Sequence, residues 1–170
     1  MLRDGAHVLI RQVQPADASL LADGFTRLSV QSRRMRFLTA KRHLSPAELR
    51  YLTDVDHHDH EAIGALSFSD RRGVGIARYI RDAEDRQAAE LAVTIVDAWQ
   101  GRGLGTQLVT RLTERARRAG ICRFTALIAV DNHAMLALLR TINGEVELVG
   151  QEFDIAEYQI ALTAHALTRS

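Results

Sequence analysis

Three glycines at alternate positions mark a place where this chain could bind an anion. Residues 99–108 read WQGRGLGTQL, in which Gln100-x-x-Gly103-x-Gly105 lies between an apolar run and a helical pattern. The first amides of a helix have no partner inside it and lie at the positive end of its dipole. Glycines let a phosphate approach such amides closely. We therefore predict a phosphate-binding turn at Gly101, Gly103 and Gly105, to which the Arg102 side chain adds a charge-assisted contact.

The turn matches neither of two common phosphate-binding motifs. The dinucleotide fingerprint requires a third glycine three residues after the second, where this chain has Thr106. The nucleoside-triphosphate loop requires Gly-Lys-Ser/Thr, whereas Gly105 here precedes Thr106 and Gln107. An alternative role stays open, in which the glycines serve only the backbone geometry of a tight turn.

A second group of reactive side chains, DVDHHDHE at residues 54–61, combines three histidines with four carboxylates. Residues 60–64, HEAIG, start like the His-Glu-x-x-His motif on a helix of zinc proteases, but Gly64 stands where the second histidine is required. The segment precedes a strand pattern and should be a loop, so no helical face aligns its side chains. We therefore expect no metal site.

The elements that must position these residues follow from hydrophobic periodicity. Helices are expected after Pro15, over 32–38 with its arginines on the outside, from the capping box of Ser45 and Glu48 to about Leu52, from the glycine turn to Gly120, and after Asn132. Strands are expected at 7–13, 61–68, 74–81, 90–96 and 124–130, and in EVELV and YQIAL near the C-terminus. This order predicts an α/β (α+β) fold, a mixed sheet with helices on both faces.

The composition is that of an ordinary globular domain. The 170 residues are 46% hydrophobic and 25% charged with a net charge of +1, which predicts one domain over residues 1–170 and no nucleic-acid or membrane partner. Aromatic residues, at 5%, are too few for a base-stacking surface. One cysteine excludes an internal disulfide, and no signal peptide or membrane-spanning run is apparent, so we expect a cytoplasmic protein.

The glycine turn and its flanks resemble a known family. AELAVTIVDAWQGRGLGTQLVTRL resembles the acyl-CoA-binding core of the GNAT superfamily of N-acetyltransferases, and DNHAML resembles that family's later Asn-initiated helix. LRDGAHVLIRQVQPADASLL, LSPAELRYLTDVDHHDHEA and VGIARYIRD resemble the acetyltransferase domain of bacterial protein lysine acetyltransferases. The resemblance covers most of residues 2–145. It implies a mostly antiparallel sheet whose central strands, 90–96 and 124–130, splay apart around a thioester.

The resemblance also implies where acetyl-CoA, the expected co-substrate, would bind. The glycine-bearing strand would pair with pantetheine through its backbone, the turn would hold the pyrophosphate, and the later helix would lie beside the pantetheine arm. The residues so implied are Val93, Thr94 and Ile95 on the strand, Gln100 and the amides of Gly101, Arg102, Gly103, Leu104, Gly105 and Thr106 in the turn, and Asn132, Met135 and Leu139 on the later helix, with Leu139 lining the pantetheine channel.

A general base is implied as well. A lysine amine has a pKa of ~10.4, so its neutral form costs about 4.6 kcal/mol at pH 7. Similar lysine acetyltransferases carry their base in the segment that matches AE-x-A here, which makes Glu90 the candidate catalytic residue. A carboxylate of pKa ~4.3 is a weak base, so Glu90 should be partly buried or act through water. The alternative is a strand-end glutamate that faces solvent.

One position departs from the family. Many members have a tyrosine seven residues after the Asn that protonates the leaving thiolate, and here that residue is Leu139. A thiol of pKa ~8.5 can leave as a thiolate at a cost of about 2 kcal/mol at pH 7. We therefore expect no single acid. Loss of turnover on replacing Tyr79, His133 or Tyr158, with acetyl-CoA affinity intact, would contradict this.

Similar proteins place the acidic histidine segment beside the acceptor. Asp54, Asp56 and Asp59 would there attract a cationic amine, less so below pH ~6.5 as the histidines protonate. The other interpretation is a solvated polar loop.

The leading function is an acetyl-CoA-dependent N-acetyltransferase that acts directly on a protein lysine, such as one on an acyl-CoA synthetase, or on a small amine. The rival is a catalytically weak acyl-CoA-binding sensor or regulatory module, which the missing tyrosine favours and Glu90 opposes. Acceptor identity, acyl-chain preference and homo-oligomer formation stay open.

Overall fold

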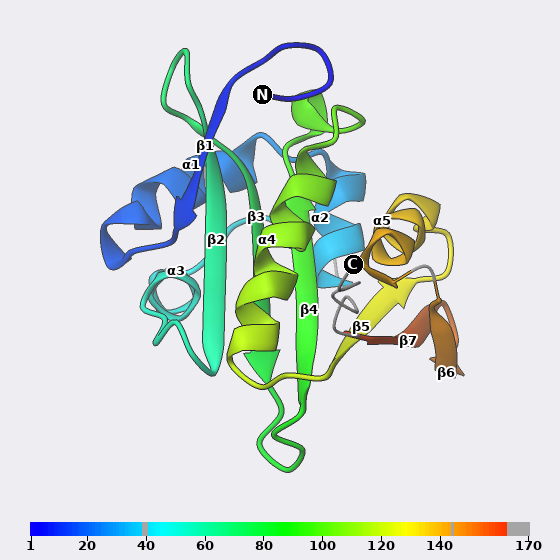
Figure 1. Ribbon diagram of the computed structural model, residues 1–170. Helices are drawn as coiled ribbons and strands as arrows, with labels where there is room; N and C mark the ends of the chain where they lie inside the picture. Colours follow the sequence, from blue (N-terminus) through cyan, green and yellow to red (C-terminus); the bar gives the residue numbers. More distant parts are fainter. Residues whose placement is uncertain (39–40, 144, 163–170) are drawn as a thin grey trace, which may run out of the picture.

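The computed structural model describes residues 1–38, 41–143 and 145–162, in which seven strands form one sheet in the order β1-β2-β3-β4-β5-β7-β6 (Figure 1). Neighbouring strands are antiparallel except β4 and β5, which run parallel. The predicted mixed, mostly antiparallel sheet is confirmed. The strands are β1 (Val8–Gln12), β2 (His60–Ser67), β3 (Gly73–Arg81), β4 (Ala88–Ile95), β5 (Arg123–Ala129), β6 (Glu147–Glu152) and β7 (Ile155–Ala161).

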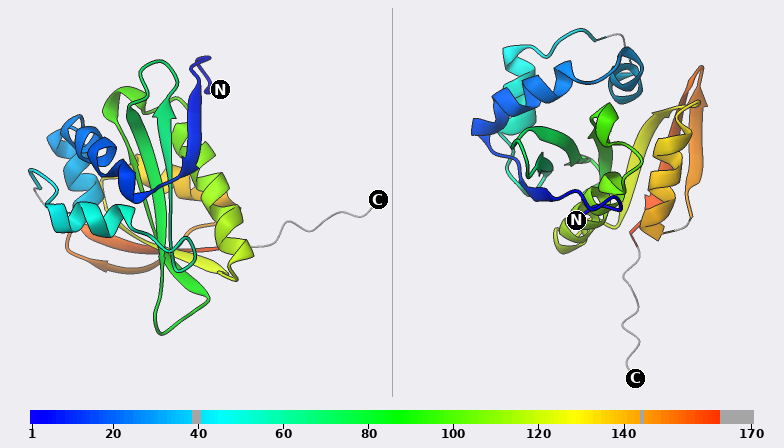
Figure 2. Two further views of the ribbon diagram at one scale, coloured as in Figure 1. Left: turned by 90° about the vertical axis from the view of Figure 1, so that its left-hand side faces the viewer. Right: turned by 90° about the horizontal axis from the view of Figure 1, so that it is seen from above.

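Helices cover both faces of the sheet, as predicted (Figure 2). α4 packs on β2, β3 and β4 on one face with α5 beside it, whereas α1, α2 and α3 lie on the other. The helices are α1 (Ala18–Thr26), α2 (Val30–Phe37), α3 (Pro46–Thr53), α4 (Leu104–Arg118) and α5 (His133–Asn143), with 3-10 turns at Pro15–Asp17 and Asp97–Trp99.

Capping residues determine where helices α2 and α3 begin. Ser45 accepts a hydrogen bond from the Glu48 amide, and the Glu48 carboxylate accepts one from the Ser45 amide, which is the predicted capping box. α2 begins at Val30, earlier than predicted, because the Ser29 side chain accepts from the Ser32 amide. The last two strands are also displaced, with β6 starting later than EVELV and β7 earlier than YQIAL.

The main hydrophobic core lies between α4 and the sheet. The apolar stripe of α4, formed by Leu104, Leu108, Leu112 and Ala116, is at most 1% exposed. A fully buried side chain of this size contributes about 1.5–3 kcal/mol. This packing holds the start of α4, and with it the glycine turn, at the end of β4.

Strands β4 and β5 separate soon after they begin, at a divergence that we call the fork. Three residue pairs join them, the last being Glu90 with Thr125, although β4 continues to Ile95 and β5 to Ala129. The remaining part of each strand is not paired with the other, so the predicted splayed pair is confirmed. In Figure 1, β5 (yellow) leans away from β4 (green).

Candidate functional site

The fork opens into a cleft of about 870 Å³, lined by residues of α2, β4, β5, α5 and the glycine turn. Most of the predicted site residues line it, namely Glu90, Val93, Thr94, Ile95, Gln100, Gly101, Gly103, Gly105, Thr106, Asn132 and Met135. The predicted residues that do not line it are Arg102, Leu104, Leu139, Asp54, Asp56 and Asp59.

Each glycine of the turn has a structural reason. Gly101 and Gly103 have φ angles of 72° and 85°, which residues with a side chain rarely adopt. A Cβ on Gly105 would lie 3.3 Å from Leu138 of α5, so glycine lets α5 approach the turn. The first bond of α4 runs from the Gln107 amide to the Gly103 carbonyl, which leaves the preceding amides without partners inside the helix. The turn thus meets the backbone requirement and also offers donors to an anion.

Two residues of the turn direct their side chains away from the cleft. The Arg102 guanidinium lies 3.2 Å from the Asp4 carboxylate and 4.7 Å from the centroid of the Trp99 ring. The predicted contact from the Arg102 side chain therefore needs correction, because an ion pair holds this group elsewhere. The Leu104 side chain is buried in the core, so only its backbone can serve a ligand.

Polar contacts tie α2 to the end of β4. The Gln100 side-chain amide donates to the Ile95 carbonyl at 3.0 Å and to the Ser32 hydroxyl at 3.4 Å. The Asp97 carboxylate accepts from the Ser29 amide at 3.1 Å. Past the fork, the β5-facing edge of β4 has no strand partner and can pair with an extended ligand, although the Ile95 carbonyl already has one donor.

Helix α2 is also tied to the far side of the fork. The Arg34 guanidinium lies 3.4 Å from the Asp131 carboxylate, just after β5, and 3.3 Å from that of Asp154, between β6 and β7. α2 therefore spans the fork, with contacts to both of its sides.

Helix α5 lines the cleft with a different residue from the one predicted. Asn132 caps the helix as expected, accepting from the Met135 amide at 3.1 Å. Leu139, predicted to line the pantetheine channel, is instead fully buried in the core, and Leu138 lines the cleft. Consecutive residues of a helix point about 100° apart, so a difference of one residue moves a side chain from the cleft to the core.

Glu90 lies at the vertex of the fork. It is the last residue of β4 paired with β5, and its side chain is exposed and lines the cleft. Glu90 is in register with Ile80, which is in register with His60, so these side chains share the sheet face covered by α1, α2 and α3. Of the two conditions expected for Glu90, partial burial is not met, because the side chain is exposed.

The acidic histidine segment is a hydrogen-bonded loop outside the cleft. Asp59 forms ion pairs with Arg81 at 2.9 Å and Arg86 at 2.7 Å. Asp56 accepts from three backbone amides of its own loop at 2.9 Å each. Asp54 ends α3 as its C-terminal cap. The structure does not bring these carboxylates to Glu90, because the loop's own bonds and the two arginines hold Asp56 and Asp59.

The expectation that the arginines of residues 32–38 lie on the outside is wrong for Arg36. Arg36 lines the cleft and also a cavity of about 90 Å³ between α1, α2, α3 and the sheet. Sequence reasoning missed this residue and its neighbours. Ser32, Met35 and Arg36 all line the cleft, and their i, i+3, i+4 spacing was the signal that could have identified this helix face.

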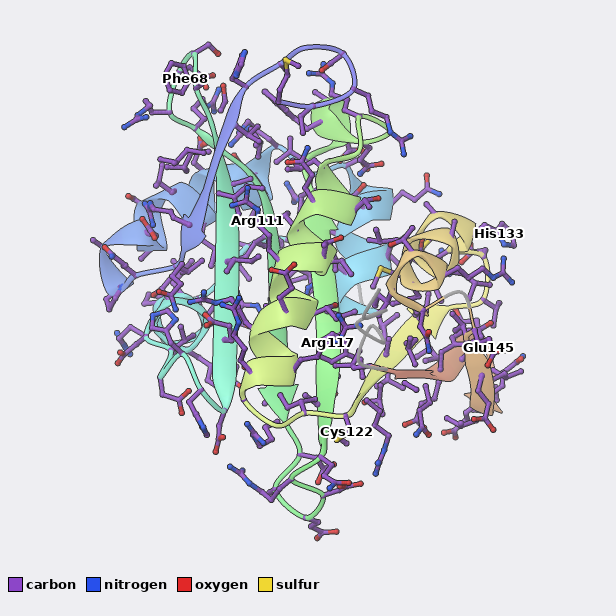
Figure 3. The ribbon with its side chains drawn as sticks, viewed as in Figure 1. Phe68, Arg111, Arg117, Cys122, His133 and Glu145 are labelled. Carbon is purple, nitrogen blue, oxygen red and sulfur yellow. The ribbon has the colours of Figure 1, made fainter. Side chains whose placement is uncertain are left out.

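The three candidate acids lie in different places. Tyr79 is 1% exposed, its hydroxyl donates to the His58 carbonyl at 3.1 Å, and burial raises its pKa to about 12. His133 lies at the start of α5 (Figure 3). It lines the cleft, whereas Tyr158 does not.

The described residues form neither a metal site nor a membrane-spanning helix. Over residues 1–38, 41–143 and 145–162, no group of three His, Cys, Asp or Glu side chains is placed to hold a metal ion. In the same ranges, no helix is both long and apolar enough to cross a membrane.

A forked sheet with a glycine turn and free helix amides at one end defines a protein that binds an extended, phosphate-bearing ligand. Comparisons with known proteins identify a family whose members bind such a ligand, acetyl-CoA. Residues 19–144 match the model of the Acetyltransferase (GNAT) family. The chain is 40% identical over 136 residues to Acetyltransferase PA5475 of Pseudomonas aeruginosa, covering 79% of this chain and 73% of that protein.

Two other relatives extend the comparison. Acetyltransferase Pat of Mycolicibacterium smegmatis is 30% identical over 138 residues, which cover 81% of this chain but 41% of that longer protein. The crystal structure of the GNAT domain of S. lividans PAT superposes with a TM-score of 0.85 at 25% identity, covering 95% of this chain and 94% of that one. The chain belongs to the GNAT family of acetyltransferases and is an N-acetyltransferase with acetyl-CoA as its acyl donor.

Proposed function

We propose that this chain transfers acetyl directly from acetyl-CoA to an amine, with Glu90 as the general base. The observation that carries the proposal is the position of Glu90 at the vertex of the fork, exposed in the cleft where the unpaired edge of β4 begins. A carboxylate there can accept a proton from an amine, directly or through one water.

The residues of the cleft fit acetyl-CoA. The β5-facing edge of β4 offers backbone groups to pantetheine, and the first amides of α4 offer donors to the pyrophosphate. Met135 and Leu138 of α5 supply an apolar wall, while Asn132 holds the start of that helix. Bound in this way, acetyl-CoA supplies the thioester that the amine attacks.

Proton removal is the step that this chain must assist. The neutral form of a lysine amine costs about 4.6 kcal/mol at pH 7. Glu90 lowers this cost by accepting the proton as the amine attacks, and a water between them fits its exposed position. No acid is required for the thiolate. Of the residues considered, His133 alone lines the cleft, so it is the one to test.

We propose a protein lysine as the acceptor, with a small amine as the alternative. The resemblance of three segments outside the glycine turn to bacterial protein lysine acetyltransferases supports the first choice. A protein acceptor would be reached in the cytoplasm.

Thiol release from acetyl-CoA tests this function, using wild type, Glu90→Gln and the matched control Glu84→Gln, an exposed glutamate in the turn before β4. With a lysine-bearing protein extract, Glu90→Gln should lower kcat by about 10²–10⁴-fold while the calorimetric Kd for acetyl-CoA stays unchanged. Glu84→Gln should behave as wild type. Acceptor-dependent release that survives in Glu90→Gln would remove Glu90 as base. Binding without turnover for any amine would favour a sensor.

A further inference from the structure

Two arginines on the acceptor side of the sheet lack an acidic partner. Arg78 of β3 is 3% exposed, and Arg36 of α2 lines both the cleft and the adjoining cavity of about 90 Å³. Among the described residues, no carboxylate oxygen lies within 4.0 Å of either guanidinium group. A buried charge is costly unless it is paired, so this arrangement calls for an anion from outside the chain.

The groups that contact these arginines do not neutralise them. The Arg78 guanidinium donates to the Leu52 carbonyl at 3.0 Å, and it also lies 3.0 Å from the ring nitrogen Nε2 of His60. Burial and the charge of Arg36 lower the pKa of Arg78 to about 9, and burial with the charge of Arg78 lowers the pKa of His60 to about 4. His60 is therefore neutral at pH 7, and the pair keeps its positive charge.

The one acid in the cavity wall is already engaged. Asp17 accepts two hydrogen bonds of 2.7 Å from Arg11. Glu90 is the carboxylate whose charge acts on Arg36, where it opposes the pKa-lowering effect of burial, but the two form no ion pair. An incoming carboxylate would therefore meet two guanidinium groups without displacing an existing ion pair.

The cavity and the cleft share three lining residues. Arg36, Phe37 and Thr94 line both spaces, and Glu90 lines the cleft. An acceptor with its amine beside Glu90 can thus place a second group against Arg36. The cavity is small and mostly apolar, which suits a short aliphatic tail that carries one charge.

We propose that Arg36 and Arg78 form an anion subsite that selects acceptors carrying a carboxylate near the reactive amine. This inference rests on the proposed transferase function and deepens it. Two sources supply the chemistry, namely the carboxylate of a free amino acid and an acidic side chain beside a lysine in a protein segment. An acceptor with only a positive charge meets the two cations without compensation.

Matched acceptor pairs test the subsite. Leucine is compared with leucinamide, and the capped peptide Gly-Glu-Lys-Gly with Gly-Gln-Lys-Gly, with kcat/KM expressed per neutral amine because removing a carboxylate also changes the amine pKa. Since a charge-assisted hydrogen bond contributes enough for about 10–150-fold discrimination, we expect at least about 10-fold preference for the carboxylate member of one pair. Whether the amino acid or the peptide pair responds identifies the source.

Three variants assign the preference to these side chains. Arg36→Gln, at a partly exposed position, should reduce the preference to within about 3-fold, and Arg78→Lys should reduce it if the variant folds. Arg118→Gln, an exposed arginine at the end of α4, is the matched control and should retain it.

Three other results would contradict the subsite, its assignment to these arginines, or the transferase function. Equal use of both members of both pairs would overturn the subsite and leave the transferase function intact. A preference that persists in Arg36→Gln would overturn the assignment to these arginines. A protein that binds acetyl-CoA in calorimetry but acetylates no acceptor would contradict the proposed function, and the subsite with it.

Discussion

The two faces of the sheet are built differently. On the α4 face, the apolar stripe of the helix is at most 1% exposed and packs on equally buried strand residues. On the other face, α1 contributes Leu20 and Leu21, which are only half-buried, above a cavity whose wall includes Arg36 and Arg78. One face is a close-packed core, and the other combines a cavity with uncompensated charge.

The two faces carry different parts of the proposed function. Close packing under α4 fixes the glycine turn relative to β4, and the pyrophosphate of acetyl-CoA requires that fixed geometry. The more loosely packed face carries Glu90 and adjoins the place of the acceptor. A cavity that the protein's own side chains leave unfilled on this face can bind part of the acceptor.

The largest expected effect compares the packing of the two faces directly. Leu112→Ala should lower the free energy of unfolding by about 2–5 kcal/mol, because it opens a cavity in a close-packed core. Leu20→Ala should cost less than about 1.5 kcal/mol, because that side chain is only partly buried and lies beside an existing cavity. Urea denaturation of both variants measures this. Equal losses would contradict the comparison.

A second prediction separates the glycine turn from helix stability. Gly103→Ala and Gly120→Ala both force alanine into a positive φ, 85° and 81°, so each should lower stability by about 1–2 kcal/mol. Gly103→Ala alone should weaken acetyl-CoA binding, by about 10-fold or more, because Gly103 is the N-cap of α4 and strain there disturbs the helix amides that face the cleft. Calorimetry checks this. Unchanged affinity in Gly103→Ala would remove the turn from the binding site.

Two adjacent residues on opposite faces should give stability different pH dependences. Burial and Arg78 lower the pKa of His60 to about 4. The unfolded chain then binds a proton first, so stability should fall by up to about 1.4 kcal/mol per pH unit between pH ~6.5 and ~4. Burial raises the pKa of Glu61, but hydrogen bonds from His57, Arg115 and Gln12 outweigh it and lower the pKa overall.

The Glu61 contribution should therefore be lost only as the pH falls below its unfolded pKa of ~4.3. His60→Gln should flatten the upper window and leave the lower one, while His58→Gln, at a 66% exposed side chain, serves as the control. Denaturation from pH 7 to 3 checks the assignment. An unchanged slope above pH 5 in His60→Gln would contradict it.

The smallest effect concerns α2, which closes the acceptor side of the fork. Arg34→Gln removes exposed ion pairs to Asp131 and Asp154, so stability should change by less than about 1 kcal/mol. The acceptor KM should rise about 2–5-fold because α2 loses its tie to the β5 side. The KM for acetyl-CoA should change less. A larger effect on acetyl-CoA than on the acceptor would place Arg34 with the donor.

Much of the fold could be predicted because local signals agreed with the tertiary structure. The Ser45 capping box, the apolar stripe of α4 and the strand periods around the glycine turn each specify one arrangement. The bounds of β6 and β7 differ from the prediction because β6 is a mostly exposed edge strand without apolar alternation, so its pairing with β7 determines the ends rather than the pattern.

The cleft could be predicted best where strand and helix ends form it, and the predicted Glu90, Asn132 and Met135 also line it. The turn and the edge of β4 depend on strand and helix ends, which the sequence marks. The prediction that Leu139 lines the cleft was wrong because α5 is apolar at both 138 and 139, and only packing decides which of the two side chains faces the core. The position of Arg36 and the ion pairs of Asp59 could not be predicted, because the partners of a charged side chain are set by tertiary contacts that no local pattern contains.

The fork also divides the sheet into two ladders, β1 to β4 and β5-β7-β6, with three residue pairs as the strand pairing between them. Local opening requires less free energy where fewer contacts break, so native-state hydrogen exchange should show a boundary between cooperative units at this seam. A molecule bound along β4 and against α5 contacts both ladders and so bridges the seam. Its binding free energy therefore adds to the free energy required to separate the two ladders.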